Sequence, residues 1–169
     1  MPPMSIKRII GVTKAYATRV GSGPFPTELS DSNGEKLQQI GKEVGVTTGR
    51  RRRCGWLDLV LLKRAHVING FTDLALTKLD VLDTFDEIKV AISYQLDGET
   101  IKSPPLAVWG RMKVDYQIFK GWQTKISGIR NYNDLPEKCR AFIEYIENYV
   151  EVPVTWIGVG EEREALIVR

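Results

Sequence analysis

The sequence contains few of the residues that build metal centres, disulfide frameworks or membrane spans. Its two cysteines, Cys54 and Cys139, have neither metal-ligand spacing nor a CxxC pattern, and we interpret them as reduced thiols of a cytosolic protein. The one histidine, His66, falls inside a helical pattern, which favours a structural role over catalysis. No apolar stretch approaches the length of a membrane span, and residues 1–4 lack the apolar core of a signal peptide. We therefore expect a cytoplasmic protein without a membrane partner.

The chain is also short of net charge, but its charges are unevenly placed. Its 169 residues, 43% hydrophobic and 27% charged, suit one globular domain with a real core, and the net charge is +3. Residues 1–53 hold ten Lys/Arg against four Asp/Glu, whereas residues 131–169 hold four against eight. The first third is therefore the expected anion-binding surface, which suits nucleotide phosphates and nucleic acid equally well.

Apolar periodicity predicts an alternation of strands and helices, and hence an α/β fold. The helix over residues 57–68 places Leu57, Val60, Leu61, Ala65 and Ile68 on one face, and Asn69-Gly70 ends it. Alternation over residues 88–96 predicts a half-exposed strand that turns into a hairpin at Asp97-Gly98. Asp134-Leu135-Pro136-Glu137 predicts a helix start capped by Asp134, with an apolar face of Cys139, Phe142, Ile143, Ile146 and Tyr149. Further strands are expected over residues 9–17, 71–77, 114–119 and 152–159, and a short helix over residues 34–44.

The first chemical signal is Thr77-Lys78-Leu79-Asp80, which follows the apolar run at residues 74–76. A strand that ends in T/N-K-x-D is the arrangement by which many GTP-binding folds choose guanine. The Asp80 carboxylate can accept two hydrogen bonds from the N1–H and N2–H₂ edge of guanine, whereas adenine offers no such pair of donors. The Lys78 stem can lie along the base while its ammonium stays hydrated.

The second signal is the basic run Thr47-Thr48-Gly49-Arg50-Arg51-Arg52-Arg53. Hydroxyls, a glycine and four guanidinium groups suit the binding of carboxylates or phosphates. The alternative is an RNA-binding or nuclear-import patch, since short arginine runs occur in both. RNA-binding surfaces usually interleave aromatic and basic residues, and no aromatic residue lies within this run, which favours a small-anion site.

A phosphate-binding glycine-rich loop of the form G-x-x-x-x-G-K-[ST] is missing. Gly34 to Gly41-Lys42-Glu43 comes nearest and fails in its spacing and its last position. The residues by themselves therefore predict guanine recognition and anion binding, with nothing that would hold the nucleotide phosphates.

Several motifs in series resemble adenylosuccinate synthetase, and they cover nearly the whole chain in the correct order. They are residues 11–16 (GVTKAY), 18–28 (TRVGSGPFPTE), 46–56 (VTTGRRRRCGW), 76–83 (LTKLDVLD) and 156–160 (WIGVG). The residues of these motifs resemble the eukaryotic forms of the family more closely. The resemblance implies part of a P-loop-NTPase-like α/β fold, with a central mixed sheet flanked by helices. It also implies a ligase that joins L-aspartate to IMP with GTP and Mg²⁺, on the route to AMP.

The resemblance assigns roles to particular residues. Lys78, Leu79 and Asp80 would bind guanine, with backbone groups of Gly158, Val159 and Gly160 beside them. The loop of Val46, Thr47, Thr48, Gly49, Arg50, Arg51 and Arg52 would close over aspartate. Arg50 would also reach IMP, Arg52 would reach GTP, and Val20 would pack near the IMP ribose.

The departure from the family is one of length, because its members have several hundred residues and residues 1–169 resemble only the C-terminal portion. The glycine-rich loop, the catalytic Asp and His, the magnesium ligands and most IMP contacts of the family have no counterpart in this sequence. We therefore expect no catalytic or metal-binding residue in this chain, and no adenylosuccinate synthesis by it alone. It is then a truncated gene product, one half of a split enzyme, or a non-catalytic guanine-binding or interaction remnant. Family members form homodimers, and a sheet without its first half would expose an edge and an apolar face.

Overall fold

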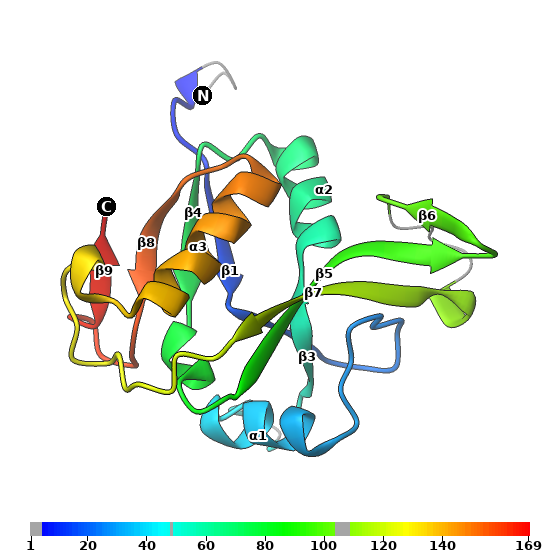
Figure 1. The fold of residues 1–169 in the computed structure, drawn as a ribbon, viewed down its shortest axis with the longest axis horizontal. Coiled ribbons are helices and arrows are strands. Elements are labelled where there is room, and N and C mark those ends of the chain that lie inside the picture. The colour runs from blue at the N-terminus through cyan, green and yellow to red at the C-terminus, as the bar shows by residue number, and fades with distance from the viewer. Residues whose placement is uncertain (1–4, 48, 104–108) are drawn as a thin grey trace.

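The computed structural model describes residues 5–47, 49–103 and 109–169, and the strands of these residues form two sheets (Figure 1). The first sheet has the order β1-β4-β8-β9, in which β1, β4 and β8 are parallel and β9 is antiparallel to β8. Its strands are β1 (Ile10–Lys14), β4 (Asp73–Thr77), β8 (Val154–Gly158) and β9 (Leu166–Val168). The second sheet contains β2 (Tyr16–Arg19), β3 (Arg53–Asp58), β5 (Glu87–Leu96), β6 (Glu99–Ile101) and β7 (Lys113–Lys120).

Helices pack on these sheets and share one apolar core with them, which confirms the α/β class. The α-helices are α1 (Ser32–Ile40), α2 (Leu59–Asn69) and α3 (Glu137–Val150), and the short 3₁₀ turns are η2 (Leu79–Leu82), η3 (Trp109–Arg111) and η4 (Tyr132–Asp134). Among the described residues, no helix is long and apolar enough to cross a membrane.

The first predicted strand, over residues 9–17, is two strands that belong to different sheets. The chain leaves the first sheet after Lys14 and joins the second at Tyr16, and the buried Ala15 lies between them. β3 was not predicted, because five of its six residues are buried and the strand therefore lacks polar–apolar alternation. β5 is more buried than expected, since it pairs with β3, β6 and β7. The predicted hairpin at Asp97-Gly98 joins β5 to β6.

The end of α2 was predicted correctly and its beginning was not. Gly70 adopts the left-handed conformation (φ 65°) and its N–H donates to the His66 carbonyl, as expected of a helix C-cap. The helix begins only at Leu59, because Asp58 ends β3 and its carboxylate accepts from the Leu61 N–H at 3.0 Å. Of the predicted apolar face only Val60 is buried within the helix, and Ile68 is 66% exposed.

The predicted apolar face of α3 is confirmed at Cys139, Phe142, Ile143 and Ile146, all fully buried. Phe142 meets Phe119 of β7 edge-on at 5.4 Å, which joins the helix to the second sheet. The predicted cap was wrong: Asp134 lies in η4 and Pro136 occupies the N-cap position. Because Pro136 has an extended ψ of 141°, the helix cannot begin before it.

The first sheet ends at β1, whose only strand partner among the described residues is β4. Val12 on this strand is 73% exposed and Ile10 is 44% exposed. The expected exposed edge with apolar side chains is therefore present at β1.

Candidate functional site

A cavity of about 300 Å³ lies where the parallel strands β4 and β8 end. Its lining residues are Ile40, Lys78, Asp80, Val81, Gly160 and Glu161. Ligands of open α/β sheets bind outside the carboxyl ends of the strands, which is where this cavity is found. The structure thus brings together three residues that the sequence placed in one site: Lys78, Asp80 and Gly160.

Lys78 turns the chain away from β4 at this point. Its backbone is left-handed (φ 58°), a conformation that costs a non-glycine residue energy and is concentrated at functional sites. The Lys78 ammonium donates to the Gly41 carbonyl at 2.7 Å and lies 3.9 Å from a carboxylate oxygen of Glu43. The lysine stem is thereby fixed along one wall of the cavity.

Asp80 faces this cavity from η2, and its carboxylate is half-buried. Burial raises the pKa of Asp80, and a hydrogen bond from its own backbone and the charge of Lys78 only partly oppose that shift. Glu161 raises it further. The carboxylate is thus kept short of solvation beside an open space, which favours a ligand that donates hydrogen bonds. The neighbouring Leu79 is fully buried in the core, so its side chain does not line the cavity.

The second predicted wall, Gly158 to Gly160, contributes mainly through Gly160. The Val159 side chain is fully buried and its N–H donates to the Ala165 carbonyl at 2.9 Å, so this donor is already used within the fold. Gly158 closes β8 next to Thr77, whose Cα lies 3.4 Å from the position that a Cβ on Gly158 would take.

Sequence reasoning missed Ile40, Val81 and Glu161 as lining residues. Ile40 ends α1, which is distant in sequence from the Lys78 motif, and no local pattern placed it here. Glu161 forms an ion pair with Lys42 at 2.7 Å on the rim of the cavity. The adjacent Gly158-Val159-Gly160 motif was the available signal for Glu161.

The basic run forms a loop, which we call the anion loop and define as Val46 to Arg52. The Gly45 N–H donates to the Arg50 carbonyl at 2.8 Å, and the Gly49 N–H donates to the Gly45 carbonyl at 2.8 Å. Gly49 has φ 62° and open space around it, and Val46 is 99% exposed. Thr47, Arg50 and Arg51 are exposed as well, and Thr48 lies outside the described residues. The side chains of Val46, Thr47, Arg50 and Arg51 are therefore accessible to solvent.

Its C-terminal end is anchored by a buried carboxylate. The Arg52 guanidinium donates to Glu43 at 2.8 Å, and the Arg52 N–H donates to the Glu43 carbonyl at 2.9 Å. Burial alone would raise the pKa of Glu43, but hydrogen bonds from Lys14, Tyr16 and Arg52 outweigh it and lower the pKa to about 2. Glu43 is thus a stable anion next to three donors.

The fourth guanidinium of the run is not part of an anion trap. Arg53 is paired through two hydrogen bonds with Glu28, and it donates to the carbonyls of Gly21 and Gly23 at 2.8 and 2.7 Å. This pair also holds the pKa of Glu28 below its usual range. The expectation of four available guanidinium groups is therefore corrected for Arg53, whose donors are used to fix the glycine-rich loop that follows β2.

Val20 follows β2 and is 67% exposed. Arg19 pairs with Arg53 at the end of the antiparallel β2–β3 ladder. Val20 therefore leaves the ladder at the end where the anion loop leads into β3. The predicted contact of Val20 with the IMP ribose stays a prediction.

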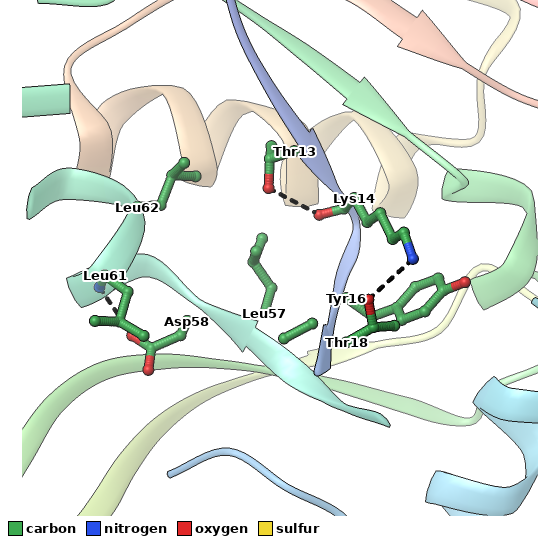
Figure 2. Close-up of a pocket in the computed structure, with 9 residues that line it drawn as sticks. Thr13, Lys14, Tyr16, Thr18, Leu57, Asp58, Leu61 and Leu62 are labelled. Carbon is green, nitrogen blue, oxygen red and sulfur yellow. Dashed lines mark hydrogen bonds between the residues drawn. The ribbon is translucent and has the colours of Figure 1, made fainter. Parts of the chain in front are cut away.

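A second cavity, of about 360 Å³, lies between β1, β2 and the start of α2 (Figure 2). Leu57, Leu61 and Leu62 form much of its wall. Its polar groups are bonded within the fold: Lys14 donates to Thr18 at 3.0 Å, and Asp58 accepts from Leu61. This lining suits apolar contact better than the binding of phosphate or base.

The two cysteines and the histidine were assigned to no binding site from the sequence. Cys54 and Cys139 are free and buried, and burial raises the pKa of the Cys139 thiol to about 12. His66 lies in α2 with its ring 6.2 Å from that of Phe71. Among the described residues, no group of three or more His, Cys, Asp or Glu could hold a metal ion.

Comparison with known proteins identifies the family. The family model of adenylosuccinate synthetase matches residues 1–167. Adenylosuccinate synthetase of Brugia malayi is 71% identical over all of this chain and 39% of its own length, and that of Caenorhabditis elegans is 60% identical over all of this chain and 37% of its own. The structure of fully ligated adenylosuccinate synthetase from Plasmodium falciparum superposes with a TM-score of 0.97 at 38% identity, covering 100% of this chain and 41% of that one. The chain spans about two fifths of these relatives, and it belongs to the adenylosuccinate synthetase family.

Proposed function

We propose that this chain is the C-terminal portion of an adenylosuccinate synthetase, the GTP-dependent ligase that joins L-aspartate to IMP. In this proposal it supplies guanine recognition and the loop that binds aspartate and IMP. The observation that carries the proposal is the cavity at the ends of β4 and β8, in which Lys78, Asp80 and Gly160 meet. Family membership supports it, since the similar adenylosuccinate synthetases align with the full length of this chain.

The cavity has the chemistry that guanine requires. A half-buried carboxylate at Asp80 would accept from the N1–H and N2–H₂ groups of the base. The Lys78 stem would cover one face of the ring. Ile40, which comes from an earlier part of the chain, adds an apolar surface to the wall of the cavity. Adenine would leave the Asp80 carboxylate desolvated and unpaired, so the site would reject ATP.

The anion loop would bind the remaining anions. Aspartate carries two carboxylates and IMP a phosphate, and the exposed residues Thr47, Arg50 and Arg51 can meet such groups at the loop surface. Arg52 would reach the GTP side and Val20 the IMP ribose. The partners proposed for the chain are therefore GTP, IMP and L-aspartate, together with the rest of a synthetase in a homodimer.

The described residues do not fit a resident Mg²⁺ ion, because they offer no cluster of three acidic or other ligand side chains. We assign no step through magnesium to this chain. In the proposal, the ion and the groups that transfer protons and phosphate belong to the remainder of the enzyme. Two free, buried cysteines are consistent with the cytosol as its compartment.

The structure weakens the alternative of an RNA-binding module. Two of the four consecutive guanidinium groups, those of Arg52 and Arg53, are directed at Glu43 and Glu28. A surface that binds RNA through this run would need these donors for phosphates. A small-anion loop needs only the exposed part of the run.

The test is nucleotide binding to the purified 169-residue chain, measured by titration calorimetry with GDP, GTP, ADP and ATP. The proposal expects binding of GDP and GTP, and at least about tenfold weaker binding of ADP and ATP, since an unpaired buried acceptor costs about 1–3 kcal/mol. Equal affinity for guanine and adenine nucleotides would overturn it. The same preparation, given GTP, IMP, aspartate and Mg²⁺, is expected to form no adenylosuccinate, and measurable turnover would contradict the assignment of catalysis to the rest of the enzyme.

A further inference from the structure

We call the cavity at the ends of β4 and β8 the guanine cavity, after its proposed ligand. Glu43 lies between this cavity and the anion loop, and its position is unusual for a carboxylate. Its side chain is fully buried, although an unpaired carboxylate is among the most costly groups to remove from water. It follows α1 and precedes the loop, in the turn where the N–H of Glu43 donates to the Gln38 carbonyl at 2.9 Å. A buried carboxylate in this position needs partners that donate hydrogen bonds to it.

The two oxygens of Glu43 serve different parts of the molecule. One accepts from the Lys14 ammonium at 2.7 Å and the Tyr16 hydroxyl at 2.5 Å, and lies 3.9 Å from the Lys78 ammonium. The other accepts from Arg52 at 2.8 Å. One carboxylate thus faces the cations Lys14, Lys78 and Arg52, which leaves an excess of positive charge that favours anions nearby.

The two residues before Glu43 each contact a residue that lines the guanine cavity. The Gly41 carbonyl accepts from Lys78, and Lys42 pairs with Glu161 on the rim. Gly41 has no room for a side chain, because a Cβ would lie 2.2 Å from the Tyr16 hydroxyl oxygen. Residues 41–43 therefore contact Lys78, Glu161 and Arg52 in succession.

We propose that Glu43 is a positioning residue that couples the guanine cavity to the anion loop by holding Lys78 and Arg52 in one charge network. This rests on the proposed function, since it concerns the same two sites. A base that stacks on the Lys78 stem would fix the ammonium on the Gly41 carbonyl and beside Glu43, and would thereby fix the turn at residues 41–43 to which Arg52 is bonded. Occupation of the cavity would in this way order the loop at its anchored end.

The test is amide hydrogen exchange of residues 45–52, followed with and without GDP. Three amides report on the loop because each donates within it or to its anchor: those of Gly45, Gly49 and Arg52. GDP is expected to slow their exchange about fivefold in the wild type and less than twofold in Glu43→Gln, which keeps the side-chain shape and removes the charge. Equal protection by GDP in both proteins would overturn the proposal.

Glu28→Gln is the matched control. It removes the carboxylate partner of Arg53, the next arginine in the run, and Glu28 has no contact with Lys78 among those that the structure describes. The fivefold protection by GDP should survive in this variant. If Glu28→Gln abolishes protection as Glu43→Gln does, general weakening of the run explains the effect and the coupling proposal fails.

A second measurement needs no nucleotide, so it decides the matter even if the chain proves unable to prefer GDP over ADP and the proposed function falls. Lys78→Met keeps the stem and removes the ammonium. Alone it should speed loop exchange about threefold, and in the Glu43→Gln background it should add nothing. Equal effects in both backgrounds would contradict the coupling. Should Glu43→Gln fail to fold, unchanged loop exchange in Lys78→Met would overturn the proposal, and faster exchange confined to residues 45–52 would support it.

Discussion

The guanine cavity and the anion loop differ in how they are built, although residues 41–43 connect them. The cavity stands on the ends of two parallel strands, and its residues Lys78 and Asp80 follow β4 directly. The described residues of the anion loop before Arg52, namely Val46, Thr47, Gly49, Arg50 and Arg51, are exposed, and the loop is held at its far end by Arg52. If the proposed function holds, this difference predicts a preformed site for the base and a loop whose contacts are completed when its anions bind.

The largest expected effect concerns the anchor that both regions share. The pKa of Glu43 is about 2, below its ordinary value of 4.5, so its ionised form stabilises the fold above about pH 4.5 and this stabilisation is lost as the pH falls towards 2. From the size of the shift we expect roughly 3 kcal/mol of acid-labile stability. Urea unfolding between pH 2 and 7 should show a flatter dependence in Glu43→Gln than in the wild type. An identical slope in both proteins would show that Glu43 is not the anchor.

The next effect isolates the cavity. Asp80→Asn should weaken GDP binding about 30-fold, or about 2 kcal/mol, because the amide replaces one acceptor by a donor that faces the donors of guanine. Calorimetric titration with GDP measures this.

Asp83→Asn is the control for the cavity, since Asp83 lies in the same turn and accepts from Trp122 and the Ile126 N–H. This variant should lower stability and leave the ratio of GDP to ADP affinity unchanged. A change in base preference at Asp83 would remove the distinction between a ligand-binding and a structural carboxylate.

A smaller effect tests the division within the arginine run. Arg53→Lys should destabilise the fold by about 1–2 kcal/mol, because a lysine cannot replace the paired contacts to Glu28 together with those to the carbonyls of Gly21 and Gly23. Affinity for GDP should stay within twofold of the wild type. Thermal unfolding and calorimetry check the two statements, and a large loss of GDP affinity would place Arg53 in the nucleotide site instead.

The smallest effect is expected at the exposed part of the loop. Arg51→Ala should change the free energy of unfolding by less than about 0.5 kcal/mol, as is usual for exposed positions. GDP binding should be unaffected, because Arg51 is absent from the lining of the guanine cavity. Chemical denaturation with a GDP titration tests both, and a loss of more than 1 kcal/mol would show that the loop is not free of the core.

Local chemistry made part of the fold predictable. Gly70 ended α2 as expected because a left-handed C-cap is a one-residue signal, and the face of α3 was correct because its apolar spacing is strong. β3 was missed, since a strand buried on both faces shows no alternation, and α2 was begun too early for the same reason. The cap of α3 was misplaced because Asp134 and Pro136 compete for one helix start.

The sequence by itself determined the family, and it singled out the motif at residues 77–80 that we propose binds guanine and the loop at residues 46–52, because each is a run of neighbouring residues with its own chemistry. Only the tertiary structure decided which arginines are occupied and what joins the two sites. Arg53 meets Glu28 and Lys78 meets Gly41 across 25 and 37 residues of sequence, and Arg52 meets Glu43 across the loop between them. Such pairings depend on how strands and turns are brought together in space, and the order of residues alone does not state them.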